Sequence, residues 1–126
     1  MKAQQGQNEL IHHIAKLIVP TEILDAYEIV SIIERTEEFE IELVEKESLI
    51  PDALKGKEAV SNGYMNPLTL QHFPMSGKRC YLKLVRRRWK EKADTKGTTS
   101  CNNTYDFAAE GTKATKNFGS FLKEYL

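Results

Sequence analysis

The chain has 126 residues, of which 40% are hydrophobic and 29% charged, a length and composition that fit one globular domain and exclude a disordered chain. The longest apolar run, residues 14–19, is interrupted by Lys16 and is far too short to span a bilayer. The formal net charge is zero, but the two halves of the chain are oppositely charged. Residues 1–63 hold 6 Lys+Arg and 13 Asp+Glu, whereas residues 64–126 hold 12 Lys+Arg and 5 Asp+Glu. The basic half predicts an anionic partner such as nucleic acid, unless the two halves neutralise each other within the fold.

The first predicted element is a helix that begins near Asn8 and ends before Pro20. Its apolar residues recur at spacings of three and four, which is typical of one helical stripe. Residues 1–9 are expected to form a flexible leader. This leader is polar and lacks the apolar core of a signal peptide, which predicts a cytoplasmic protein. Residues 21–24 are expected to form one further helical turn, because Pro20 and Glu22 suit a helix N-terminus.

A first β-hairpin is predicted from residues 28–34 and 39–45, joined by residues 35–38. The first strand is rich in β-branched residues, and the second alternates apolar and acidic residues. Glu38, Glu40 and Glu42 share one strand face, with Glu45 further along. A solvated strand face is the favoured interpretation of these carboxylates, and a cation site is the alternative.

Residues 48–67 are expected to form an irregular connection with a short helical turn at residues 52–54. A second hairpin follows, in which residues 68–73 lead through a turn at residues 74–78 into a long strand at residues 79–92. Residues 93–104 are predicted to be a mobile loop. An amphipathic helix, with Thr112 as its N-cap, is predicted to run to the end of the chain. Together these elements predict a single α+β domain over residues 1–126, with both hairpins in one antiparallel sheet.

The strand at residues 79–92 carries the strongest functional signal, because seven of its 14 residues are basic. A protruding basic strand with an aromatic residue near its tip suits a nucleic-acid backbone. We expect phosphate contacts from Lys83, Arg86, Arg87, Arg88 and Lys90, and stacking on the nucleic acid from Trp89. Lys113 and Lys116 would extend this surface. The alternative is a solvated edge strand, or one whose charges pair with the acidic first hairpin.

Catalytic and metal sites are not predicted for this chain. It contains no phosphate-binding glycine loop and no nucleophile motif. Cys80 and Cys101 are its only cysteines, too few for a four-ligand zinc site, and no cofactor is expected. His72 is interpreted as a packing or hairpin-surface residue. A metal-dependent nuclease that uses three of the many carboxylates is the least favoured interpretation.

The second hairpin and the segment after it resemble a known family. Residues 72–79, followed by Arg86, Arg87, Arg88 and Trp89, are similar to the hairpin and basic strand near the N-terminus of bacterial insertion-sequence transposases. Residues 105–115 are similar to the segment that leads into the helical DNA-binding region of those proteins.

The whole chain resembles the short N-terminal region protein of transposases that are encoded in two frames. The resemblance implies a role in transposition, recognition of insertion-sequence ends, and catalytic residues in a separate downstream domain or chain. It therefore implies two partners, DNA and the downstream catalytic subunit. The alternative function is a protein-interaction subunit that assembles with that separately encoded catalytic subunit.

Overall fold

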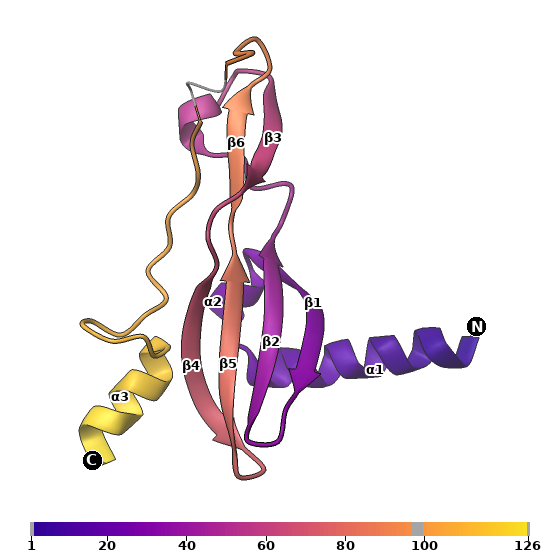
Figure 1. Cartoon of the computed structure of the whole chain (residues 1–126), viewed down its shortest axis with the longest axis vertical. Coiled ribbons are helices and arrows are strands. Elements are labelled where there is room, and N and C mark those ends of the chain that lie inside the picture. Colours follow the sequence, from indigo (N-terminus) through magenta and orange to yellow (C-terminus); the bar gives the residue numbers. More distant parts are fainter. Residues whose placement is uncertain (1, 97–99, 126) are drawn as a thin grey trace.

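The computed structural model describes residues 2–96 and 100–125, apart from the side chains of residues 2–8 and Ile11. It is an α+β fold, as the sequence predicts, with a sheet and helices at one end and a two-stranded ribbon that projects from the other (Figure 1). The elements are α1 (Lys2–Ile18), α2 (Thr21–Leu24), β1 (Tyr27–Glu34), β2 (Glu38–Glu45), the 3-10 helix η1 (Asp52–Leu54), β3 (Ala59–Tyr64), β4 (Leu68–Met75), β5 (Lys78–Val85), β6 (Arg87–Glu91) and α3 (Lys116–Tyr125).

The main sheet has four strands in the order β1-β2-β5-β4. The outer pairs β1–β2 and β4–β5 are antiparallel, but the central pair β2–β5 is parallel. The prediction of an all-antiparallel sheet is therefore wrong. The physical reason is that a long connection, which includes β3 and β4, returns the chain to the start of the sheet and lets β5 run alongside β2.

Strands β3 and β4 form one arm of a long hairpin, and strands β5 and β6 form the other, so that β4 pairs with β5 and β3 pairs with β6. The part of the hairpin next to the turn, β4 and β5, belongs to the main sheet. The far ends of the two arms, β3 and β6, form the projecting ribbon. The prediction of an irregular connection over residues 48–67 is therefore wrong for residues 59–64, which form β3. The expected long strand is also divided, because Arg86 separates β5 from β6.

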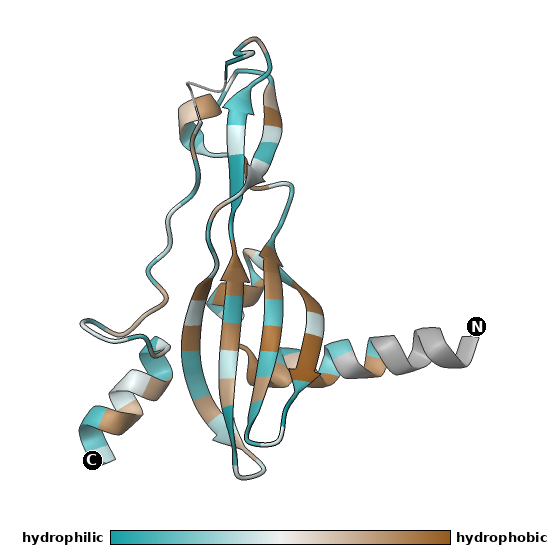
Figure 2. Ribbon diagram, viewed as in Figure 1, coloured by the Kyte–Doolittle hydropathy of each residue, from teal (hydrophilic) through white to brown (hydrophobic). Residues whose placement is uncertain are grey.

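The core lies between one face of the main sheet and the helices α1 and α2. Hydrophobic residues alternate with hydrophilic ones along the sheet strands (Figure 2), and the buried set includes Ile41, Leu43, Leu82 and Leu84. The end of α1 contributes Ala15 to this core, Val19 follows directly after the helix, and α2 contributes Ile23. The predicted helix start near Asn8 is too late, because α1 begins at Lys2 and includes most of the expected leader. No helix in the described residues is long and apolar enough to cross a membrane.

The C-terminal segment lies along the free edge of β4 before it turns into α3. The Gln71 N–H donates to Lys113 O (2.8 Å), and the Thr115 N–H donates to Gln71 O (2.9 Å). Helix α3 begins at Lys116, so the predicted N-cap at Thr112 is wrong. Thr115 is better placed, since its Oγ1 accepts the Phe118 N–H at 3.4 Å, the bond that an N-cap side chain makes. Thr112 instead donates its hydroxyl to Ala109 O at 2.8 Å, which closes the preceding turn.

Candidate nucleic-acid interface

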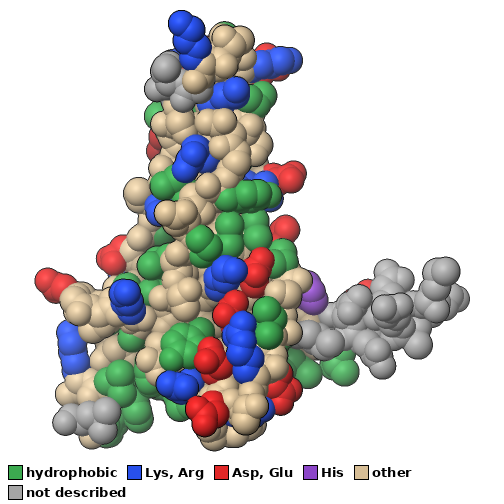
Figure 3. Space-filling model, in the orientation of Figure 1, with side chains coloured by type: hydrophobic (Ala, Val, Ile, Leu, Met, Phe, Trp, Pro, Cys, Tyr) green, Lys and Arg blue, Asp and Glu red, His purple; other side chains and the backbone are tan. Residues whose placement is uncertain are grey.

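Much of the charge asymmetry between the two halves of the chain is neutralised within the main sheet. Lys78 pairs with Glu34 at 2.7 Å, Lys83 with Glu42 at 3.6 Å, and Arg79 with Glu37 at 3.7 Å. Figure 3 accordingly shows basic and acidic side chains side by side over the sheet. The sequence left open the alternative that the basic strand pairs with the acidic first hairpin. The structure shows this pairing for β5. Lys83 is thus a half-exposed ion-pair partner of Glu42 rather than an isolated cation.

Arg87 is anchored at the junction between the sheet and the ribbon. Its N–H donates to Oε1 of the buried Glu45 (2.9 Å), and its Nε donates to the Glu45 backbone oxygen (2.7 Å). Its guanidinium also lies 3.6 Å from Glu47 and 5.6 Å from the centre of the Tyr64 ring. These contacts assign Arg87 a structural role in holding the start of β6.

Glu45 is the centre of a buried polar cluster. Its Oε2 accepts hydrogen bonds from the Asn103 amide (3.1 Å) and from the hydroxyl of Tyr105. Arg86 joins the same cluster, because it donates to Asn103 O at 3.2 Å. Burial, together with the nearby Glu45 carboxylate, raises the pKa of Tyr105 and of Tyr27 well above 10. Both phenols therefore stay neutral.

Sequence reasoning grouped Glu45 with the other acidic residues of its strand and missed this role. Its position in the alternation of the strand could have revealed this role. Glu38, Glu40 and Glu42 occupy even positions, whereas Glu45 continues the odd positions of Ile41 and Leu43, which are buried. A carboxylate on the apolar face of a strand needs partners when it is buried, so its position alone predicts a hydrogen-bonded cluster.

Trp89 is buried, with 7% of its surface exposed, so no nucleic-acid base can stack on its ring in this structure. The prediction that Trp89 is exposed at a ribbon tip is wrong. The alternation of buried positions changes phase at Arg86, from the even residues Cys80, Leu82 and Leu84 to the odd residue Trp89. The backbone of Trp89 also pairs with Cys101 through two 2.8 Å hydrogen bonds, which places the expected loop residue beside β6.

Arg88 and Lys90 are the predicted site residues that the structure leaves available on the ribbon. They alternate with the buried Trp89 along β6, and both are partly exposed. Neither forms an ion pair or a side-chain hydrogen bond with any other residue in the described ranges 2–96 and 100–125. No described residue therefore neutralises their charges.

Lys113 and Lys116 lie at the other end of the molecule, near the start of α3 (Figure 1). Lys116 pairs with Asp106 at 3.0 Å. Lys113 is exposed and lines a groove of about 800 Å³ between β4 and α3. The predicted set of eight residues is thus not one continuous surface, and only its ribbon and groove members remain as candidate contacts.

The histidines, cysteines and carboxylates were the remaining candidates for a metal site. Among the described residues, no group of three or more His, Cys, Asp or Glu side chains is placed to hold a metal ion. His72 is buried and hydrogen-bonded to Thr115 and Ile18, which agrees with its interpretation as a packing residue. Comparison of the chain with protein-family models, curated proteins and solved structures gave no match.

Proposed function

We propose that this chain is a DNA-binding module that uses the β3–β6 ribbon to contact duplex DNA. The observation that carries the proposal is the pair Arg88 and Lys90, two cations on a ribbon that projects from the body of the protein. Neither has an ion-pair or side-chain hydrogen-bond partner among the residues that the structure describes. The other basic residues of β5 and the junction have carboxylate or carbonyl partners of their own.

The shape of the ribbon supports the same proposal. Its two strands, of six and five residues, form a narrow projection. Neighbouring strands lie about 4.8 Å apart. The major groove of B-DNA is about 12 Å wide and accepts a two-stranded β-ribbon. The resemblance to transposase N-terminal region proteins supports insertion-sequence ends as the DNA and a separately encoded catalytic subunit as the partner. In this proposal the protein is non-catalytic and cytoplasmic.

The proposal is tested with a labelled DNA duplex that carries the insertion-sequence end, here called the element end. Its binding is measured by fluorescence anisotropy at several salt concentrations. The Arg88→Ala/Lys90→Ala variant is expected to bind more weakly. The slope of log K against log salt should become shallower by about 1.8, because each lost phosphate contact removes about 0.9. Arg86 and Arg87 are left intact in this design, since replacing them would disturb the Glu45 cluster.

A control variant, Lys16→Ala/Lys46→Ala, changes the net charge by the same amount on α1 and after β2. It should keep both the affinity and the salt slope. Equal losses in the two variants would show that only net charge matters, and the ribbon assignment would then be abandoned. A scrambled duplex of the same length measures whether the element end is preferred.

A protein-interaction subunit is the second candidate, and exposed apolar residues favour it. On α3, Phe121 is 42% and Tyr125 65% exposed, so part of its apolar face is uncovered. In this proposal α3 packs against the separately encoded catalytic subunit. The Phe121→Ser/Tyr125→Ser variant should then fail to co-purify with that subunit, while the ribbon variant should still do so. Co-purification without any affinity for DNA would make this the leading account.

A further inference from the structure

Helix α1 projects beyond the main sheet as a free-standing arm (Figure 1). Its 17 residues give it a length of about 25 Å, at a rise of about 1.5 Å per residue. Among the α1 side chains that the structure describes, Ala15 alone is buried in the core. Isolated helices shorter than about 12–15 residues are marginally stable in water, so the part of α1 before Ala15 gains stability from a packing partner.

One face of this arm carries an apolar stripe that the fold leaves uncovered. Leu10, Ile14 and Leu17 recur at spacings of four and three, which places them on one face of the helix and is called the α1 stripe here. Their exposed fractions are 59%, 48% and 78%. Alternating spacings of four and three are those of the contact line between two packed helices. The α1 stripe therefore has the pattern of a helix–helix interface.

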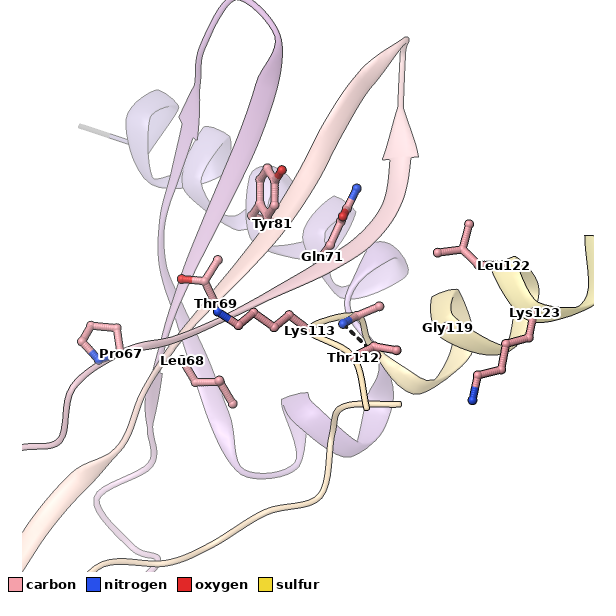
Figure 4. Close-up of a pocket in the computed structure, with 11 residues that line it drawn as sticks. Pro67, Leu68, Thr69, Gln71, Tyr81, Thr112, Lys113, Gly119, Leu122 and Lys123 are labelled. Carbon is pink, nitrogen blue, oxygen red and sulfur yellow. Dashed lines mark hydrogen bonds between the residues drawn. The ribbon is translucent and has the colours of Figure 1, made fainter. Parts of the chain in front are cut away.

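An apolar pocket adjoins the α1 stripe at Ile14. The pocket has a volume of about 430 Å³ and is lined mainly by apolar side chains from α1 and three strands, among them Ile14, Ile32, Phe39 and Met75. Glu34 and Ser76 are the polar members of the described lining. The groove between β4 and α3 is larger, but polar side chains, including Thr69, Gln71 and Lys113, line it (Figure 4). The surface beside α1 therefore suits an apolar helix better.

The charges beside the α1 stripe favour a second copy of this chain as the partner. Glu9 and Lys16 each precede a stripe residue by one position, so both lie on the same flank of the stripe, and both are exposed. Two antiparallel α1 helices can place Leu10 of each copy against Leu17 of the other. Glu9 of each copy then lies within one turn of the other copy's Lys16. A parallel pair would instead bring like charges level with each other, which is unfavourable.

We propose that this chain forms a symmetric dimer through antiparallel packing of its two α1 helices along their apolar stripes. A two-fold interface uses the same patch on both copies, so the patch must complement itself. The α1 stripe meets this condition, because its apolar residues face apolar residues and the Glu9–Lys16 contact is formed twice. The inference goes beyond the proposed function and does not rest on it.

The test measures the mass of the full chain by sedimentation equilibrium over a wide range of concentrations, without DNA. One chain has a mass of 14.4 kDa, and the measured mass should rise toward twice this value. Leu10→Ser/Leu17→Ser is expected to raise the dimer dissociation constant at least about a hundredfold, because four leucines lose their contacts. The control Ile50→Ser/Leu68→Ser replaces exposed apolar residues elsewhere and should keep the dimer.

Charge reversal tests the antiparallel arrangement without removing any apolar residue. Lys16→Glu and Glu9→Lys should each raise the dissociation constant about tenfold, because each change turns two attractions into two repulsions. The double variant Glu9→Lys/Lys16→Glu should restore the dimer. Both side chains are exposed, so these variants remain informative even if the serine variant unfolds. Lys16→Ala, part of the duplex-binding control, removes the attraction without adding repulsion and should stay dimeric.

The outcomes are distinct from those of the duplex-binding experiment. A chain that stays monomeric at every concentration overturns the dimer and leaves the α1 stripe to a different partner. A dimer that persists in Leu10→Ser/Leu17→Ser also overturns the proposal, and one that ignores both charge reversals overturns the antiparallel arrangement. Loss in the serine and single charge variants, with recovery in the double variant, supports it. Dependence of duplex binding on Arg88 and Lys90 is unaffected by any of these results.

Discussion

Nδ1 of His72 lies 2.7 Å from Oγ1 of Thr115, and this contact joins β4 to the residue that caps α3. On the other side of the ring, Nε2 lies 2.9 Å from the backbone oxygen of Ile18 at the end of α1. A carbonyl oxygen only accepts, so Nε2 carries the proton and Nδ1 accepts the hydroxyl hydrogen of Thr115. One neutral imidazole thus connects the sheet to both long helices.

The His72 contact predicts that stability falls in mild acid. Burial lowers the pKa of His72 below its usual value, and the hydrogen bond to Ile18 and the nearby Glu22 only partly oppose this effect. Below about pH 6.5 the unfolded chain therefore binds the proton more readily than the folded chain. The His72 contribution is fully present above about pH 6.5 and is lost as pH falls toward the folded-state pKa. Urea unfolding at pH 7.5 and 5.5 should show this loss, and His72→Gln should reduce it. An identical loss in that variant would contradict the assignment.

Removing the Glu45 carboxylate should destabilise the fold strongly. Glu45→Ala leaves the Arg87 N–H, the Asn103 amide and the Tyr105 hydroxyl without their acceptor, which is expected to cost about 3 kcal/mol. Glu45→Gln keeps one acceptor oxygen and should cost less. Chemical denaturation measures both changes. Glu38→Ala, a substitution of a half-buried glutamate on the same strand, is the control and should have a small effect.

Gly119 should not tolerate a methyl group. A Cβ built at Gly119 would lie 2.3 Å from Cβ of Ala109, so α3 and the returning segment are too close for a larger residue. Gly119→Ala is therefore expected to destabilise the protein by about 1–3 kcal/mol, although the same change in an open helix favours folding. Adding Ala109→Gly should recover part of the loss. Simple additivity of the two changes in thermal unfolding would argue against the contact.

The turn between β4 and β5 should accept a better residue at Ser76. Ser76 and Gly77 both have positive φ, at 52° and 75°, as a two-residue type I′ hairpin turn requires. Asparagine adopts this conformation more readily than serine, so Ser76→Asn is expected to raise the free energy of unfolding by about 0.5 kcal/mol. Ser76→Val should lower it, because a β-branched side chain is strained there. A higher stability for the valine variant would refute the turn assignment.

Trp89 should report a buried environment both with and without DNA. It is the only tryptophan in the chain, so its emission is unambiguous. We expect blue-shifted emission and weak quenching by acrylamide, and little change when duplex DNA is added. Trp89→Phe should bind the duplex as the parent does. Trp89→Ala should destabilise the fold by about 3–5 kcal/mol, because it empties a large buried volume. Strong quenching by DNA would restore stacking as its role.

Local patterns in the sequence predict local structure well in this chain. The expected strands at residues 28–34 and 39–45 agree with β1 and β2, and the short turns at residues 21–24 and 52–54 are helical. Strand β3 escaped prediction because Asn62 and Gly63 within it have low strand propensity, and the turn signal outweighed Val60. The pairing with β6 compensates for that weak local preference.

The sequence pattern did not predict contacts between segments that lie far apart in the chain. The parallel contact between β2 and β5 depends on the path of a distant connection, which periodicity does not report. The basic residues were also easier to recognise in the sequence than the residues that neutralise them. The basic strand is visible in the sequence, but which members are neutralised depends on register, as the pairing of Lys83 with Glu42 shows. The groove between β4 and α3 likewise arises only when residues 112–123 return beside β4.

The long hairpin also implies an order of folding. Its pairs extend from Met75 with Lys78, next to the turn, to Ala59 with Glu91 at the ribbon, so it can close progressively from a short loop. The seam between β2 and β5 instead joins residues 41 positions apart, from Glu38 with Arg79 to Val44 with Val85. We therefore expect both hairpins to form first and the seam to close last, as the slow step. Until then β1–β2 and β4–β5 each expose a strand edge, so a weakened seam leaves the chain open to aggregation while the ribbon is already formed.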